Sequence, residues 1–324
     1  MTSHAINAKP PLTILLAAPR GFCAGVERAV QMVEESLRLY GSPVYVRHQI
    51  VHNQAVVNRL SSMGAVFVEN LAGLPAGAKV IFSAHGVAKS VPLDAKERGL
   101  IPLDATCPLV TKVHREAEKH FAEGRQIILV GHRGHPEVTG TMGQLPEGAV
   151  LLVENEADAR SVQPTTPQHL AYCTQTTLSV DDTIKIVGIL QQRFPTIEGP
   201  KREDICYATT NRQKAVKAIA EMADAVLVLG SANSSNSNRL VEVALSTGCP
   251  QARLIDGADN LDMGWLQTVK RLGITAGASA PEHLVEELLE KIRLHYSVTV
   301  EEIRVAEENV VFRMPRLPQP EQAH

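Results

Sequence analysis

The chain has 324 residues, of which 44% are hydrophobic, so it is long enough to bury a sizeable core and to form two or three domains. Its formal net charge is −3 and aromatic residues make up only 4%, which excludes the basic surface and stacking side chains typical of nucleic-acid binding. No apolar run reaches the ~18 residues that a membrane helix needs, and the N-terminal apolar run 14–18 is too short for a signal peptide, so we expect a cytoplasmic protein. Thiols stay reduced in that compartment, so the five cysteines indicate metal or redox chemistry before disulfides.

Three of these cysteines divide the chain into thirds. Cys23, Cys107 and Cys206 are separated by 84 and 99 residues, and each precedes a stretch whose apolar residues recur at helical spacing. A thiolate at the start of a helix is stabilised by the helix dipole, which favours reactive or metal-binding cysteines at these positions. Cys173 lies inside an apolar strand pattern, so we interpret it as a small core residue, and we interpret Cys249, which lies in a turn, as structural or incidental.

Two sets of polar residues repeat in phase with the three cysteines. One set lies in polar loops after short apolar strands, 28 or 29 residues beyond the preceding cysteine: His52, His135 and Ser234. The other set follows further apolar strands at less regular spacing: His85, Thr176 and Ser279. Strands that alternate with helices in this way predict parallel sheets built from βαβ units.

We therefore predict an α/β fold of three related domains with mostly parallel sheets in a pseudo-threefold arrangement. The predicted domains span 12–105, 106–204 and 205–297, and a C-terminal strand and tail span 298–324. Ligands of open α/β sheets bind beyond the carboxyl ends of the strands, where each repeat places its polar loops. We expect these loops to meet at one central site, unless the repeat reflects only a duplication that left one domain active.

The spacing of the cysteines excludes several metal sites. The absence of a C-x-x-C pair argues against a structural zinc ribbon, and the absence of closely spaced cysteines argues against a ferredoxin-like cluster motif. The H-x-E pattern from His135 to Glu137 occurs in zinc deaminases, but their P-C-x-x-C motif is missing. A site with three cysteines remains, and three thiolates on a four-iron cluster would leave one iron open to a substrate.

Neutral hydrogen-bond donors in the predicted loops suit a phosphate or diphosphate. The run SANSSNSN, which contains Ser234, Ser235 and Asn236, holds more polar groups than one helix cap requires. Glu137 is either a proton relay beside His135 or a first-turn carboxylate favoured by the helix dipole, and both interpretations stay open. The sequence contains no G-x-G-x-x-G turn and no Walker-type loop, so a redox enzyme of this kind would take its electrons from outside.

At these residues the chain closely resembles the 4-hydroxy-3-methylbut-2-enyl diphosphate reductase family of the non-mevalonate isoprenoid pathway. The matching motifs include PRGFCAGVERAV, DATCPLVTKVH, TQTTLSVDDT, DICYATTNRQ and GSANSSNSNRL, and they run in order from about residue 12 to 313. The resemblance implies three α/β domains around a central iron–sulfur site, in agreement with the repeat.

The resemblance also implies a role for each site residue. Cys23, Cys107 and Cys206 match the ligands of one 4Fe–4S cluster whose fourth iron meets the substrate hydroxyl. Glu137 matches the proton donor, and Thr176 matches a residue beside that hydroxyl. The residues that match the diphosphate-binding set are His52, His85, His135, Ser234, Ser235, Asn236 and Ser279.

The implied reaction uses two electrons and two protons to remove an allylic hydroxyl as water, and it yields isopentenyl and dimethylallyl diphosphate. A reduced ferredoxin or flavodoxin would supply the electrons, and neither nucleic acid nor a membrane is an expected partner. Two other classes stay open: a non-redox hydro-lyase that uses the open iron only as a Lewis acid, and a non-catalytic iron–sulfur or zinc sensor. Product analysis with and without reductant distinguishes the hydro-lyase, and a sensor would not need a buried ring of anion donors.

Overall fold

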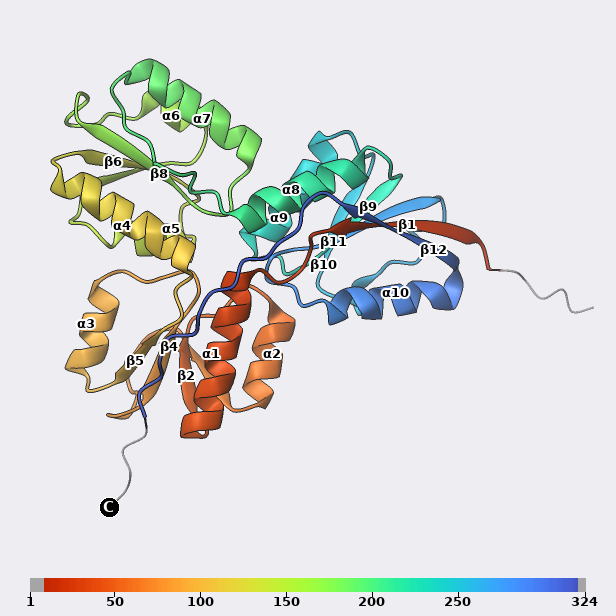
Figure 1. Ribbon diagram of the computed structural model, residues 1–324, viewed down its shortest axis with the longest axis horizontal. Helices are drawn as coiled ribbons and strands as arrows, with labels where there is room; N and C mark the ends of the chain where they lie inside the picture. The colour runs from red at the N-terminus through yellow and green to blue at the C-terminus, as the bar shows by residue number, and fades with distance from the viewer. Residues whose placement is uncertain (1–8, 320–324) are drawn as a thin grey trace, which may run out of the picture. The chain divides into compact units, whose positions relative to one another are not determined.

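The computed structural model describes residues 9–319, which form two compact units. Unit 1 comprises residues 9–22 and 210–309, and unit 2 comprises residues 23–209 and 310–319. The strands form three sheets, one in unit 1 and two in unit 2, and every strand pair in them is parallel (Figure 1). The predicted α/β fold with mostly parallel sheets is confirmed. No helix in the described range has the length and apolar composition needed to cross a membrane.

Unit 1 contains a five-stranded sheet with the strand order β10-β9-β11-β1-β12. Its strands are β1 (Pro11–Ala18), β9 (Ala225–Leu229), β10 (Ala252–Ile255), β11 (Arg271–Ala276) and β12 (Ser297–Arg304). Its helices are α9 (Ser235–Ser246), α10 (His283–His295) and the 3-10 helix η1 (Ala258–Asn260), and α8 (Tyr207–Ala220) continues into it from unit 2. Side chains of α8 and α9 pack with those of β1 and β9 in one hydrophobic core.

The first strand pairs with partners that are distant in sequence. β1 lies between β11 and β12, and its pairing with β12 runs from Pro11 opposite Ser297 to Ala18 opposite Arg304. The predicted first domain, 12–105, is therefore wrong at its beginning, because its first strand belongs to the sheet of the last repeat. The physical reason is burial: Leu15 and Ala17 are fully buried and complete the core formed by α8 and α9.

Unit 2 contains two lobes, each with its own sheet. The sheet of lobe 1 has the order β3-β2-β4-β5, with β2 (Val44–Arg47), β3 (Ala65–Val68), β4 (Lys79–Phe82) and β5 (Ile101–Asp104). Its helices are α1 (Ala24–Tyr40), α2 (Gln54–Ser62) and α3 (Ser90–Glu97). The sheet of lobe 2 has the order β7-β6-β8, with β6 (Gln126–Val130), β7 (Val150–Val153) and β8 (Leu170–Thr174). Its helices are α4 (Pro108–Ala122), α5 (Pro136–Met142), α6 (Glu156–Ser161) and α7 (Val180–Arg193).

The two lobes of unit 2 contact each other through short loops at the ends of β4 and α5. The backbone N–H of Lys89 donates to the carbonyl of Gly143 at 3.1 Å, and the Gln144 amide donates to the carbonyl of Val87 at 2.7 Å. A Cβ at Gly143 would lie 2.2 Å from the Cβ of Ala88, so only glycine permits this approach. The contact holds the loops that carry the predicted histidines next to each other.

The segment that leads to each predicted cysteine pairs with the sheet of the preceding repeat, through a strand for Cys23 and Cys107 and through an isolated bridge for Cys206. β5 leads to Cys107 and pairs with β4 in lobe 1, and Glu198 precedes Cys206 and pairs with Ala171 of β8 in lobe 2. β1 leads to Cys23 and pairs with β11, a strand of the last repeat. The segment before each cysteine thus pairs with the sheet of the preceding repeat, and for β1, which belongs to the first repeat, that partner is the last repeat.

Candidate active site

The three predicted cysteines lie at the starts of three helices. Cys23 and Cys107 are the N-cap residues of α1 and α4, and Cys206 directly precedes α8. Neither Cys23 nor Cys107 uses its thiol to cap its helix, and Pro108 begins α4 with the fixed backbone angle that suits this position. The helix starts predicted from the apolar spacing are confirmed, and all three thiols belong to unit 2.

The three thiols lie close together although they are far apart in sequence. A Cβ at Gly25 would be 2.6 Å from the sulfur of Cys107 and 3.9 Å from that of Cys23, so a glycine keeps this space clear. The backbone N–H of Ala24 donates to the Tyr207 hydroxyl at 3.3 Å, which brings the start of α8 to the start of α1.

Deprotonation of all three thiols is unfavourable in this cluster unless positive charge is bound there. Burial, with a smaller contribution from the charge of Cys23, raises the pKa of Cys107 to about 12 and that of Cys206 to about 11. The backbone N–H and hydroxyl of Thr209 lie 3.4 and 3.2 Å from the sulfur of Cys206 and partly offset this. Bound positive charge would reverse the balance, because a coordinated thiol loses its proton.

Three imidazole rings form a second cluster in unit 2. The rings of His52 and His85 stack with centroids 4.1 Å apart, and His135 meets both edge-on at 5.5 and 5.7 Å. His52 follows β2 and His85 follows β4, both in lobe 1, whereas His135 is the N-cap residue of α5 in lobe 2. The structure thus brings together three histidines that the repeat places after apolar strands, two from one set and one from the other.

These histidines are neutral at pH 7. Burial lowers the pKa of His52 to about 4 and that of His135 to about 3, and it lowers the pKa of His85 well below its ordinary value. Repulsion from neighbouring histidines contributes to all three shifts. The Nδ1 atom of His135 accepts the backbone N–H of Glu137 at 3.1 Å, so its proton lies on Nε2. The cluster therefore offers neutral N–H donors to a ligand.

Glu137 lies in the first turn of α5 and is only 2% exposed. Its Oε1 accepts the backbone N–H of Thr176 at 2.7 Å, and its Oε2 accepts the Thr176 hydroxyl at 2.9 Å. Burial raises the pKa of Glu137, the two bonds from Thr176 lower it and the charge of Asp204 adds to the rise, which together bring the pKa to about 7. A carboxyl group that is half protonated near pH 7 suits proton transfer.

The remaining predicted donors lie in unit 1, after the carboxyl ends of β9 and β11. Ser234 caps α9, which begins at Ser235, and Ser279 is buried in the loop after β11. The Oδ1 of Asn236 accepts the backbone N–H of Ala278 at 2.9 Å, which joins these two loops. The Nδ2 of Asn236 is buried and has no hydrogen-bond partner among the described residues, so it is available to a ligand.

The other two cysteines belong to hydrophobic cores. Cys173 lies in β8 and is 3% exposed, within the core of lobe 2. Cys249 is equally buried and packs in the core of unit 1. The structural interpretation of both residues is confirmed, and burial raises the pKa of each thiol.

An ion pair that the sequence analysis missed holds the segments that carry the thiols. Lys112 of α4 donates to Asp204 Oδ1 at 2.9 Å, and the other carboxylate oxygen accepts the backbone N–H of Thr174 at 2.9 Å. The pair thus joins the helix that follows Cys107 to the segment before Cys206. Both residues lie in or next to the motifs quoted above, but their pairing has no local sequence signal.

Comparisons with known proteins agree with the motifs. The family model described as "LytB protein" matches residues 14–293. The chain belongs to the LytB family. It is 60% identical over 312 residues to the 4-hydroxy-3-methylbut-2-enyl diphosphate reductase of Hyphomonas neptunium, covering 96% of this chain and 99% of that relative. It is also 60% identical over 309 residues to the reductase of the same name from Phenylobacterium zucineum, covering 95% and 98% of the two chains.

Solved structures give the same assignment. The E-1-hydroxy-2-methyl-but-2-enyl-4-diphosphate reductase from Plasmodium falciparum aligns with a TM-score of 0.88 and 39% identity, over 96% of each chain. Another solved structure, described as (E)-4-hydroxy-3-methyl-but-2-enyl diphosphate reductase, the terminal enzyme of the non-mevalonate pathway, aligns with a TM-score of 0.63 and 33% identity, over 87% of this chain and 99% of that one. The family resemblance inferred from the motifs is confirmed.

Proposed function

We propose that this LytB family member is an oxidoreductase that converts 4-hydroxy-3-methylbut-2-enyl diphosphate to isopentenyl and dimethylallyl diphosphate. The reaction takes up two electrons and two protons and releases the allylic hydroxyl as water. Family membership and the names of relatives that are 60% identical support this assignment. We also propose a cytoplasmic location and a reduced ferredoxin or flavodoxin as the electron donor.

The observation that carries the proposal is a buried proton donor in the same unit as three clustered thiols. Glu137 is buried against Thr176, and burial raises its pKa to about 7. Three neutral imidazoles lie in the same unit, where they can donate hydrogen bonds to an anion. An iron–sulfur or zinc sensor would use the thiols but needs neither the buried acid nor the imidazole donors, whereas a reductive dehydroxylation needs a proton source and a means of holding its diphosphate substrate.

Cys23, Cys107 and Cys206 are the proposed ligands of one 4Fe–4S cluster. The fit rests on the chemistry of the donor set: all three thiols are free, and those of Cys23 and Cys107 border the space kept clear by Gly25. The raised pKa values of Cys107 and Cys206 call for bound positive charge. When bound, such a cluster would supply the electrons, and an iron without a protein ligand would act as a Lewis acid toward the hydroxyl oxygen.

The hydrogen bonds of Glu137 determine where its proton resides. Oε1 accepts the backbone N–H of Thr176, which can only donate, so the acid form carries its proton on Oε2. That proton then points to Thr176 Oγ1, and the Thr176 hydroxyl is free to donate onward to the substrate hydroxyl. Glu137 thus delivers a proton to the substrate hydroxyl, relayed by either Thr176 or a phosphate oxygen of the substrate. The hydroxyl then leaves as water rather than as hydroxide.

Neutral donors are proposed to bind the diphosphate. In unit 2 these are the three imidazoles, and His135 presents its Nε2–H because its Nδ1 is already engaged. In unit 1 the proposed donors are Ser234, Ser235, Asn236 and Ser279, and the buried amide of Asn236 has a donor without a partner among the described residues. Neutral donors bind an anion without the strong attraction of cations, which favours product release.

The decisive experiment measures product formation from the diphosphate substrate under anaerobic conditions, with and without saturating reductant. The proposal expects both isoprenoid diphosphates with reductant and none without it. Product without reductant would instead support the hydro-lyase, and iron without any turnover would support the sensor. Iron and sulfide content with an anaerobic absorption spectrum tests the cluster separately.

A further inference from the structure

The proposed function requires electrons from outside the chain, and one segment of unit 2 has the charge to attract their carrier. The C-terminal segment 310–319 contains Arg313 and Arg316 and no acidic residue, although the whole chain has a net charge of −3. Both arginine side chains are exposed, and within the described part of the chain neither forms an ion pair. We call this segment the basic tail.

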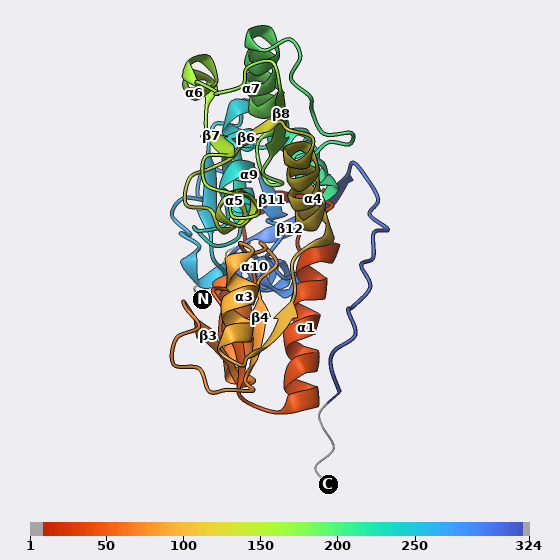
Figure 2. The same ribbon diagram turned by 90° about the vertical axis from the view of Figure 1, so that its left-hand side faces the viewer.

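The basic tail is fixed along α1, as Figure 2 shows. Arg28, in the first half of α1, donates from Nε to the carbonyl of Arg313 at 3.1 Å. Tyr40, the last residue of α1, donates its hydroxyl to the carbonyl of Pro318 at 2.6 Å. Two anchors at opposite ends of the tail therefore hold its arginines in place without using their side chains.

The acidic residues beneath the tail do not cancel its charge. Glu34 and Glu35 of α1 line the groove between the helix and the tail. Glu34 is paired with Arg59 at 2.6 Å, and Glu35 is paired with Arg38 at 2.7 Å. Both glutamates that line the groove are therefore paired with arginines outside the tail.

The anchor of the tail also contacts the segment that carries Cys107. Arg28 donates from Nη1 to the carbonyl of Thr106 at 3.0 Å and to that of Ala105 at 3.4 Å. One side chain thus bonds both to the tail and to the residue before a proposed cluster ligand. A carrier held at the tail would lie near the thiols, which matters because electron transfer between proteins requires a short distance.

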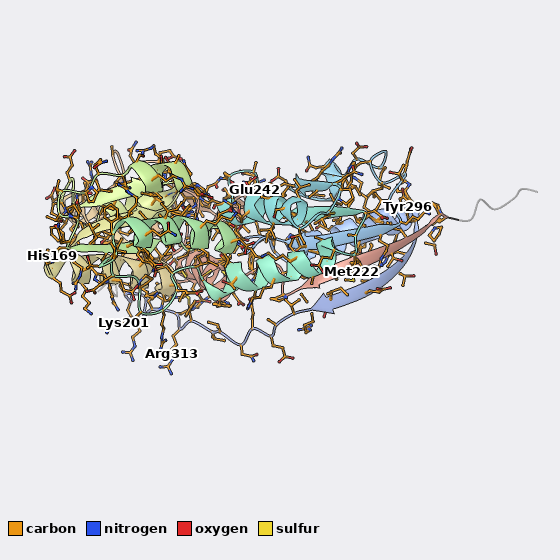
Figure 3. The ribbon with its side chains drawn as sticks, turned by 90° about the horizontal axis from the view of Figure 1, so that it is seen from above. His169, Lys201, Met222, Glu242, Tyr296 and Arg313 are labelled. Carbon is orange, nitrogen blue, oxygen red and sulfur yellow. The ribbon has the colours of Figure 1, made fainter. Side chains whose placement is uncertain are left out.

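A second pair of exposed cations precedes Cys206. Lys201 and Arg202 lie in a loop that Lys112 fixes to α4, through bonds from its Nζ to the carbonyls of Arg202 at 2.5 Å and Glu203 at 3.2 Å. Lys201 and Arg313 lie on the same side of unit 2, as Figure 3 shows. The residues 201–203 and the basic tail together carry four cations and one acid, a net charge of +3.

We propose that the basic tail and the loop 201–203 form the docking surface for an acidic one-electron carrier protein. This inference rests on the proposed function: two carriers are each oxidised by one electron, and the two electrons with two protons convert the allylic alcohol to alkene and water. Charge complementarity selects the partner, because electron-transfer encounters bury little surface and depend on electrostatic steering. The chain's overall negative charge would otherwise repel an acidic carrier.

The test compares two double charge reversals, R313E/R316E and K201E/R202E, in the cluster-loaded full-length enzyme. The matched control is K96E/R160E, which reverses two exposed cations on α3 and α6, away from the tail (Figure 2). Each variant is assayed with a reduced plant-type ferredoxin, with a reduced flavodoxin and with saturating reduced methyl viologen, at low and high salt. Iron content shows whether each variant retains its cluster.

We expect kcat/KM for the protein carriers to fall by roughly 10-fold or more at low salt in both docking variants. Their salt dependence should flatten, because screening no longer removes an attraction. Turnover with methyl viologen and the behaviour of the control should match the unmodified enzyme.

Two results would overturn the proposal in distinguishable ways. If the docking variants keep the carrier kinetics and salt dependence of the unmodified enzyme, or if K96E/R160E loses as much, the surface is wrong while the enzymatic function stands. If the unmodified enzyme shows no turnover with methyl viologen, the proposed function itself fails, and the docking role fails with it.

Discussion

Replacing Glu137 by glutamine removes the carboxyl proton and changes little else at that position. The glutamine Oε1 can still accept the backbone N–H of Thr176, which the carboxylate accepts at 2.7 Å, and the amide N–H can donate to the Thr176 hydroxyl. We therefore expect cluster assembly and substrate binding to survive, while kcat falls by roughly 100-fold or more, the usual scale for loss of a general acid.

The role of Glu137 also predicts how kcat changes with pH. Burial raises the pKa of Glu137 from 4.5 to about 7, so the acid form is depleted above pH 7. The kcat of the unmodified enzyme should therefore fall about tenfold per pH unit above that value. The residual activity of Glu137→Gln should lack this limb, because glutamine does not titrate.

The raised pKa of Glu137 also affects stability. As pH rises from 4.5 toward 7, the unfolded chain loses the Glu137 proton while the folded chain keeps it, so the folding free energy becomes less favourable. Each tenfold change in the acid dissociation constant corresponds to about 1.36 kcal/mol, so the loss reaches about 3 kcal/mol above pH 7 for a carboxyl that is only 2% exposed. The unfolding free energy of Glu137→Gln minus that of the unmodified protein should therefore be larger at pH 8 than at pH 4.5.

The assay measures kcat from pH 6 to 9 under saturating reductant, so that electron delivery does not limit turnover. Thr176→Val is the companion variant, and it should do less harm, because a water or a phosphate oxygen can bridge the gap that it leaves. If Glu137→Gln turns over near the unmodified rate while Thr176→Val does not, the acid lies elsewhere and His135 becomes the next candidate.

Three further variants test the thiol and imidazole clusters. Cys107→Ser should abolish iron incorporation, measured by metal analysis, whereas Cys173→Ala should retain it because that thiol lies in a hydrophobic core. Gly25→Ala should cut iron content at least by half, since its Cβ would lie 2.6 Å from the sulfur of Cys107, whereas Gly188→Ala in α7 meets nothing within 4 Å and should retain iron. His85→Phe keeps a ring that can stack but removes the N–H donor, so KM should rise roughly 10- to 100-fold at unchanged iron content; an unchanged KM would exclude His85 from substrate binding.

Local patterns in the sequence were sufficient for much of the fold and for the candidate site residues. Apolar spacing predicted the helices after Cys23, Cys107 and Cys206, and the structure begins α1, α4 and α8 at those positions. The in-phase loops also appear where the repeat places them, with His135 and Ser234 as N-cap residues of α5 and α9. These features depend on helix starts and strand ends, which neighbouring residues determine.

Only the tertiary structure decided which strands pair and what the buried groups do. β1 reads as an apolar strand in any context, but it pairs with β11 and β12 because the core of α8 and α9 has room for Leu15 and Ala17. Likewise, Glu137 is a first-turn carboxylate in the sequence, and it becomes a group with a pKa of about 7 only when folding buries it against Thr176. Strand partners and desolvation both depend on residues that are distant in the chain, so no local pattern contains them.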